Sequence, residues 1–208
     1  QHVVRAHAMD KIEMLARILQ ADGRGPTIVF CRTKRACQKT SDDLIERGFK
    51  AATLHGDMGQ PAREKALNDF KGGKSDVLIA TDVAARGIDI DGITHVINYQ
   101  CPEDEKTYVH RIGRTARAGA YGIALTFVDW DELARWKMID MALKLGLAEP
   151  LETYSSSEHL YAMMKIPAGS TGRMDKPRKS APAAEKKSER PPVAREKRER
   201  VRTKKFTS

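Results

Sequence analysis

The sequence is poor in the features that stabilise secreted or membrane-embedded chains. It has three cysteines, Cys31, Cys37 and Cys101, with no Cys-x-x-Cys pair and no histidines at zinc spacing, so neither a disulfide framework nor a metal site is expected. No stretch longer than eleven residues lacks a charged side chain, which is too short for a membrane span, and the first residues do not resemble a signal peptide. We therefore expect a cytoplasmic protein that binds no membrane.

A phosphate-binding loop of the Walker A type is also missing. That loop needs Gly-x-x-x-x-Gly-Lys followed by Ser or Thr, and the nearest match, at residues 73–75, has Asn68 in place of the first glycine. The match also follows a predicted helix and precedes a predicted strand, which is the reverse of the order in a phosphate loop. No metal-binding carboxylate pair accompanies it. Since the chain opens with Gln1, we interpret it as a fragment or a trimmed chain that cannot hydrolyse ATP alone.

Positive charge is concentrated at one end of the chain. Residues 167–208 carry 14 Lys/Arg and 5 Asp/Glu, which accounts for the whole net charge of +9. This end is rich in Lys, Arg, Glu, Pro, Ala and Ser, and it cannot bury enough apolar surface to offset the entropy of ordering it, so it is predicted to be disordered. A flexible polycation such as residues 195–205 suits a polyphosphate backbone, and a merely solubilising tail is the alternative.

Short apolar runs alternate with amphipathic stretches in the rest of the chain. The runs predict buried strands at residues 27–30, 51–54, 77–80, 94–99 and 123–128. The stretches predict helices at about residues 10–19, 34–47, 61–70, 103–112 and 131–145. This alternation favours an open α/β domain with helices on both faces of a parallel sheet. We expect that domain at residues 1–150, a connecting segment at 151–166 and the basic tail at 167–208.

Ligands of such sheets gather at the loops that follow the carboxyl ends of the strands. This rule directs attention to the polar segments at residues 31–34, 55–60, 81–89 and 110–118. In the last of them, Arg111, Arg114 and Arg117 recur at every third position. Three guanidinium groups without nearby carboxylates repel one another unless an anion meets them, and their planar donors suit phosphate oxygens. A solvated basic helix end is the alternative.

Residues 80–90 form a second polar segment directly after a predicted strand. Gly87 allows the backbone to approach a ligand closely. Four polar side chains share this short strand-to-loop junction: Thr81, Asp82, Arg86 and Asp89. An ordinary turn rarely carries a hydroxyl, an arginine and carboxylates in so short a space.

Four segments together resemble motifs of the second RecA-like domain of superfamily 2 helicases, and of the DEAD-box family in particular. Residues 28–34 (IVFCRTK) resemble motif IV, residues 55–70 (HGDMGQPAREKALNDF) the HGD and Q-x-x-R element, residues 80–90 (ATDVAARGIDI) motif V and residues 110–119 (HRIGRTARAG) motif VI. Their order and spacing match over roughly residues 1–150. The His that opens motif VI is typical of DEAD-box proteins, whereas DEAH-box and RecQ-like relatives usually have Gln. Ala116 departs from the pattern, which most often has Gly.

The resemblance implies a RecA-like fold that works with an amino-terminal RecA-like domain, which holds ATP and Mg²⁺. The catalytic residues it implies are Arg114, Arg117 and His110, with the two arginines reaching the γ-phosphate across the cleft. The nucleotide-binding residues it implies are Asp89, Gly87 and Arg111. Asp89 would accept hydrogen bonds from the ribose, and His110 and Arg111 would couple the nucleotide to motif V.

The resemblance also implies an RNA surface. Gln60, Arg63 and Thr81 would face RNA phosphates and sugars, together with the free N–H groups at the start of the helix near Pro61. Arg86 would lie between the RNA and the nucleotide. Such contacts do not read bases, so we expect sequence-independent binding. The expected activity is that of an ATP-dependent RNA helicase, with RNA and ribonucleoprotein complexes as partners.

Two other functions fit the same residues. The chain could be a stand-alone RNA-binding or regulatory module without ATPase activity, although Arg114, Arg117 and Asp89 argue against it. A DNA-directed helicase of the same superfamily is the other alternative, and RNA-selective contacts to the 2′-OH would exclude it. Trp130 and Trp136 are interpreted as packing residues, with Trp130 near a strand end also a candidate for stacking on bases.

Overall fold

The computed structural model describes residues 1–88, 90–117, 119 and 121–174; the tail beyond residue 174 and Asp89 lie outside this description. Its strands are β1 (His2–Ala6), β2 (Thr27–Phe30), β3 (Ala51–Leu54), β4 (Val77–Ala80), β5 (His95–Asn98), β6 (Ile123–Val128) and β7 (Leu151–Thr153). Its helices are α1 (Lys11–Ile18), α2 (Lys34–Glu46), α3 (Gln60–Lys71), α4 (Asp82–Ala85), α5 (Glu105–Ile112), the 3₁₀ turn η1 (Trp130–Glu132), α6 (Leu133–Leu143) and α7 (Glu158–Met164).

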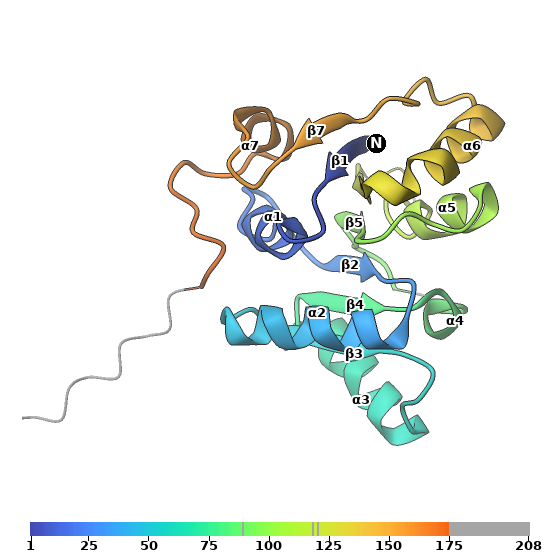
Figure 1. Ribbon diagram of the computed structural model, residues 1–208. Coiled ribbons are helices and arrows are strands. Elements are labelled where there is room, and N and C mark those ends of the chain that lie inside the picture. The colour runs from blue at the N-terminus through green and yellow to red at the C-terminus, as the bar shows by residue number, and fades with distance from the viewer. Residues whose placement is uncertain (89, 118, 120, 175–208) are drawn as a thin grey trace, which may run out of the picture. The chain divides into compact units, whose positions relative to one another are not determined.

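The strands form one sheet in the order β3-β4-β2-β5-β6-β1-β7, and every neighbouring pair is parallel (Figure 1). Because consecutive parallel strands need a crossover, the helices return the chain over the faces of the sheet. The open RecA-like α/β sheet expected from the sequence is confirmed.

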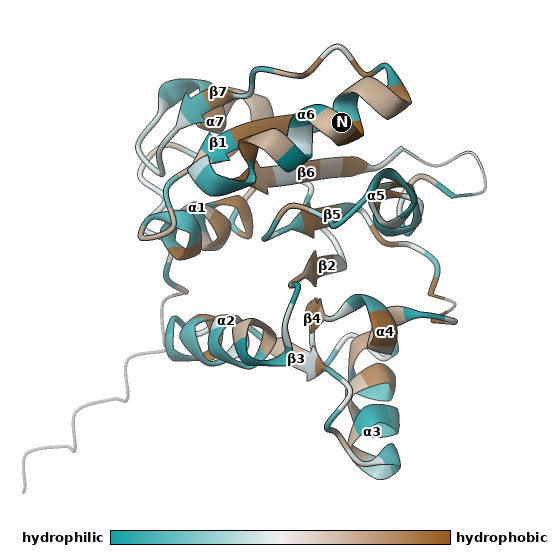
Figure 2. Ribbon diagram, turned by 45° about the vertical axis from the view of Figure 1, so that its right-hand side comes forward, coloured by the Kyte–Doolittle hydropathy of each residue, from teal (hydrophilic) through white to brown (hydrophobic). Residues whose placement is uncertain are grey.

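The two faces of the sheet are both covered, as the alternation within β2 illustrates. Val29 packs into a core built with α1, α2 and α7, whereas Ile28 and Phe30 pack into a core on the opposite face with α3 and α4. A third cluster joins α5 and α6 through Tyr108 and Trp136. Figure 2 shows the central strands with α1 and α2 on one side and α3, α4 and α5 on the other. Within the described part of the chain no helix is long and apolar enough to cross a membrane.

Residues 151–166, expected to be a connecting segment, instead complete the domain. β7 pairs with β1 in parallel register, and Leu160 and Met164 of α7 are buried in the main core. These residues belong to the same compact unit as the rest of the sheet. The strand β1 was not predicted either, because Arg5 interrupts its apolar residues, so only its pairing with β6 and β7 reveals it.

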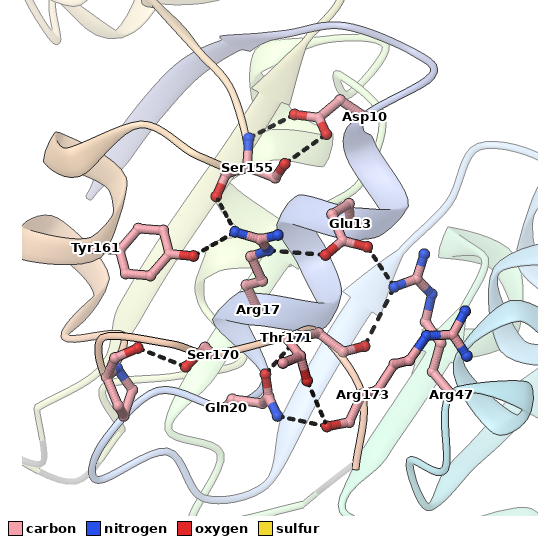
Figure 3. A network of polar contacts seen from close by, with 12 residues as sticks. Asp10, Glu13, Arg17, Gln20, Arg47, Ser155, Tyr161, Ser170, Thr171 and Arg173 are labelled. Carbon is pink, nitrogen blue, oxygen red and sulfur yellow. Dashed lines mark hydrogen bonds and ion pairs between the residues drawn. The ribbon is translucent and has the colours of Figure 1, made fainter. Parts of the chain in front are cut away.

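A polar network fastens this last segment to α1 and α2 (Figure 3). Asp10 accepts hydrogen bonds from the N–H and the hydroxyl of Ser155, at 2.6 and 2.7 Å. Arg17 donates to the Ser155 carbonyl at 3.2 Å and to the hydroxyl of Tyr161 at 2.5 Å. Gln20 accepts from the N–H of Gly172 at 2.8 Å. Residues up to 173 are therefore held by the domain, although the tail was predicted to begin at 167.

A buried histidine at the start of β5 makes the stability of this fold depend on pH. His95 is 4% exposed, and burial, helped by the positive charge of Arg24, lowers its pKa from 6.5 to about 4. The unfolded chain therefore binds a proton at this histidine near pH 6.5, whereas the folded chain binds it only near pH 4. We expect the free energy of unfolding to fall by about 3 kcal/mol as the pH is lowered through this window.

Urea unfolding at several pH values measures this loss. His95→Gln is the control, because carboxylates that titrate in the same window contribute equally to both proteins. The difference in the free energy of unfolding between the wild-type protein and the variant should shrink as the pH is lowered. A difference that does not depend on pH would contradict the assignment to His95.

Candidate nucleotide and RNA site

The first arginine of the 110–119 segment is buried. Arg111 is 1% exposed, and its guanidinium forms a bidentate pair with Asp82, with both N–O distances at 2.7 Å. The same guanidinium donates to the side chain of Asn98 at 3.2 Å and to the carbonyl of Gln100 at 3.0 Å. This clamp ties α5 to the carboxyl ends of β4 and β5, and it leaves almost none of the Arg111 side chain exposed.

The other two arginines lie at the surface, beyond the end of α5 at Gly113. Arg114 donates to the carbonyl of Ile88 at 2.7 Å, and the Nε of Arg117 donates to the carbonyl of Gly113 at 3.0 Å. Both side chains are partly exposed and line a cavity of about 320 Å³ together with Tyr121. The structure thus separates one buried arginine from two accessible ones, a distinction that their equal spacing conceals.

Motifs V and VI come together around a second cavity of about 320 Å³. Its lining includes Asp82 and Arg86 from one segment, and His110, Arg111 and Arg114 from the other. The structure therefore places these side chains around one cavity, and Arg114 lines both cavities.

The turn within motif V needs glycine for its backbone conformation. Gly87 has φ +76°, a region that other residues adopt only with strain, and no atom lies within 4 Å of a Cβ added there. Ala116 has φ 55°, which explains why Gly is common at this position in the family: the alanine here carries a strain of roughly 1–2 kcal/mol.

One expectation about placement was wrong. The 110–118 segment does not follow the carboxyl end of a strand, because it leaves α5 toward the amino ends of β5 and β6. Thr115 donates to the carbonyl of Ile93, just before β5, at 2.5 Å, and the N–H of Ile123 at the start of β6 donates to the carbonyl of Thr94 at 2.9 Å. Arg114 nevertheless contacts motif V, because Ile88, in the loop that follows α4, accepts its hydrogen bond.

The residues expected to face RNA lie where α3 and α4 meet. Gln60 opens α3 with its side chain exposed and bonded to Glu64 at 2.8 Å, while Arg63 reaches the carbonyl of Ala84 in α4 at 3.5 Å. α3 has no side-chain cap, so its first N–H groups are available to an anion. Thr81 is 8% exposed at the start of α4, so only a small part of it is accessible.

The sequence did not identify Asp82 as the ion-pair partner of Arg111. A carboxylate directly after a buried strand suggests a role at the site, but the arginine that it pairs with lies far along the chain.

A buried group of charges around Glu132 was not predicted either. The carboxylate of Glu132 is within 4 Å of the charged nitrogens of Lys11, Arg32 and Arg135. Within residues 1–88, 90–117, 119 and 121–174, no cluster of side chains suits a metal ion.

An open parallel sheet that directs two accessible arginines to one side, and has no phosphate loop of its own, defines the second RecA-like domain of a helicase motor. The chain belongs to the DEAD-box RNA helicases, as their helicase C-terminal domain. The sequence model of the family described as "Helicase conserved C-terminal domain" matches residues 10–119.

Individual relatives support the same family. ATP-dependent RNA helicase CshA of Listeria monocytogenes is 43% identical over 166 residues, covering 80% of this chain and 32% of that protein. The E. coli DEAD-box protein SrmB, solved bound to regulator of ribonuclease activity A, is 33% identical with a TM-score of 0.67, covering 76% of this chain and 91% of that one. S. cerevisiae Dbp5, solved bound to RNA and ADP BeF3, is 31% identical with a TM-score of 0.67, covering 79% of this chain and 44% of that one. The chain thus spans about a third of the curated relative's length.

Proposed function

We propose that the intact protein is an ATP-dependent RNA helicase that separates short duplexes, and that this domain supplies its arginine fingers and half of its RNA groove. The observation that carries the proposal is the position of two partly exposed arginines: Arg114 is bonded to the carbonyl of Ile88, next to Gly87, and Arg117 lines a cavity together with Arg114. Fixed cationic donors aimed at a transferring phosphoryl group stabilise the charge that develops on it.

The residues present fit the phosphates of ATP but not its metal ion. Guanidinium groups match phosphate oxygens, whereas Mg²⁺ prefers carboxylates and water, and no suitable cluster exists among the residues described. An amino-terminal RecA-like domain would hold the metal, which would neutralise negative charge on the phosphates. Asp89 and Gly87 are proposed to meet the ribose edge of the same nucleotide.

Arg111 and His110 are proposed to position these groups. Arg111 holds motif V through Asp82, so a movement of α5 shifts both motifs together. His110 is exposed beside that clamp, where it can contact the amino-terminal domain. Closing of the two domains around ATP and RNA would assemble the site, and product release would reopen it.

The RNA contacts are proposed to come from Gln60, Arg63 and Thr81, with Arg86 between them and the nucleotide. The uncapped start of α3 supports a phosphate contact at this place. A solved relative, S. cerevisiae Dbp5, has been captured with RNA and ADP BeF3. We further propose a cytoplasmic location, which the free, buried state of Cys31, Cys37 and Cys101 supports.

Reconstitution in trans tests the function. The pure chain should not hydrolyse ATP, and addition of the amino-terminal domain with RNA should produce hydrolysis measured as phosphate release. Turnover by the pure chain would contradict the proposed division of labour. Binding of RNA without any hydrolysis in the mixture would favour a stand-alone binding module, and equal stimulation by DNA would favour a DNA-directed enzyme.

The basic tail is proposed to bind further RNA phosphates. Because Gly172 and Arg173 are bonded to Gln20, a deletion that removes the tail alone begins after Met174. We expect the deletion to flatten the dependence of log affinity on log salt concentration by about 0.7 for each phosphate of single-stranded RNA that the tail neutralises. A tail of the same composition in scrambled order is the control and should preserve the slope. An unchanged slope after deletion would leave the tail without an RNA role.

A further inference from the structure

Three aromatic rings stand side by side at the carboxyl ends of three neighbouring strands. Trp130 follows β6, His7 follows β1 and Tyr154 follows β7, and these strands are adjacent in the sheet. The ring centroids of His7 and Tyr154 are 5.4 Å apart in a stacked arrangement at 17°. Those of His7 and Trp130 are 6.3 Å apart at 65°. The rings therefore form one continuous aromatic row along this edge.

The aromatic row is exposed, although large aromatic side chains are mostly buried in folded proteins. Trp130 is 52% exposed and Tyr154 is 42% exposed, whereas Trp136 is fully buried and bonded through its indole N–H to the carbonyl of Leu147. The packing role expected for both tryptophans thus applies to Trp136. Single exposed rings are ordinary, whereas exposed rings that lie together in one patch can mark a binding surface.

Charged neighbours hold the rings in place. The guanidinium of Arg5 lies 4.1 Å from the centre of the Trp130 ring and pairs with Glu152 at 3.2 Å. Glu152 also accepts a hydrogen bond from the hydroxyl of Tyr154 at 2.9 Å. Arg5 covers one face of the Trp130 ring, and His7 and Tyr154 each cover one face of the other. The surface of Trp130 and Tyr154 that stays exposed is the part available to a ligand, and these contacts fix its orientation.

The row lies on the same edge of the sheet as the proposed RNA residues, since the carboxyl ends of parallel strands share an edge. From β4, where Thr81 lies, to β7 is five strand spacings, or roughly 24 Å. Between them, Arg32 and Arg135 flank the buried Glu132, and their side chains are 30% and 37% exposed. Lys11 and Asp129 complete this group of charges with an ion pair of 2.6 Å, so the group as a whole carries one excess positive charge.

We propose that Trp130, His7 and Tyr154 form a stacking platform for unpaired RNA bases that leave the groove along this edge, with Arg32 and Arg135 contacting the phosphates between. The proposal rests on the RNA-binding function proposed above. Stacking on aromatic faces accepts any base, which agrees with sequence-independent binding. A strand held at both the groove and the row would be less free to re-pair with its complement.

Tryptophan fluorescence tests the platform directly in the 208-residue chain, which has two tryptophans. Oligouridine long enough to pass the groove should quench the emission of Trp130. Trp130→Phe should abolish the quenching, since Trp136 is buried, while keeping a ring for stacking. An oligonucleotide of equal length and charge with abasic sites should not quench. Equal quenching by the abasic strand, or none by oligouridine that is bound, would overturn the platform.

Affinities for oligouridines of increasing length provide a second readout. Trp130→Ala and Tyr154→Ala should each weaken long strands by about tenfold and leave short strands unchanged, because stacking contributes on this order per base. Met138→Ala is the control, an exposed apolar side chain on α6 outside the row. If short strands bind through Arg63 and no variant shows a length-dependent loss, the platform fails while the RNA function stands. If no strand of any length binds, both fail.

Discussion

Replacement of Arg114 by alanine is expected to lower the rate constant of ATP hydrolysis by about 10³- to 10⁵-fold in the two-domain protein, the range found for arginine fingers in phosphoryl transfer. The guanidinium is already held by its bond to the Ile88 carbonyl, so, in the proposed role, little reorganisation is needed when charge develops on the phosphoryl group. The measurement is phosphate release in a single turnover, with saturating RNA and ATP.

The variant must keep its fold for this result to count. The loss of the hydrogen bond from Arg114 to the Ile88 carbonyl costs about 1 kcal/mol, and a single cooperative thermal transition shows that the variant is folded. Lys137→Ala removes a surface cation that pairs with Glu149 and should hydrolyse ATP at the wild-type rate. A folded Arg114→Ala protein with nearly normal hydrolysis would mean that the arginine faces the nucleotide without acting on it.

The Asp82→Ala substitution is expected to reduce the free energy of unfolding by about 3–5 kcal/mol, because it leaves the buried guanidinium of Arg111 without its counter-charge. The bonds from Arg111 to Asn98 and Gln100 remain but carry no negative charge. Urea unfolding measures the loss. It is the largest stability effect we expect at the site, since the bidentate pair joins β4 and α5 directly.

Two controls separate this effect from the general loss of an ion pair. Lys39→Ala removes the exposed pair with Asp43 on α2 and should cost about 0.5 kcal/mol or less. The double variant Asp82→Ala with Arg111→Met should recover much of the stability, because neither charge is then buried alone. A double variant as unstable as Asp82→Ala would show that the lost stability came from packing at position 82.

Much of the fold could be predicted because its central strands are continuous apolar runs. β2, β3, β4 and β6 begin and end at the predicted residues. β1 escaped prediction because Arg5 interrupts its apolar residues, and β7 because it has three residues, one of which is Glu152. Their stability comes from pairing with strands far away in the sequence, which no local pattern records.

The candidate site was predictable in composition and not in geometry. The spacing of Arg111, Arg114 and Arg117 suggested a shared anion, yet it could not tell which guanidinium points inward, because that depends on the position of Asp82 in the folded chain. The aromatic row was hidden for the same reason, since Trp130 and Tyr154 become neighbours only through β1.

The most direct measurement for the central claim is the crystal structure of the two-domain protein with RNA, ADP and beryllium fluoride. The account predicts a guanidinium nitrogen of Arg114 or Arg117 within about 3 Å of a fluoride, a hydrogen-bonding distance. If neither guanidinium lies within hydrogen-bonding distance of a fluoride, the account is contradicted.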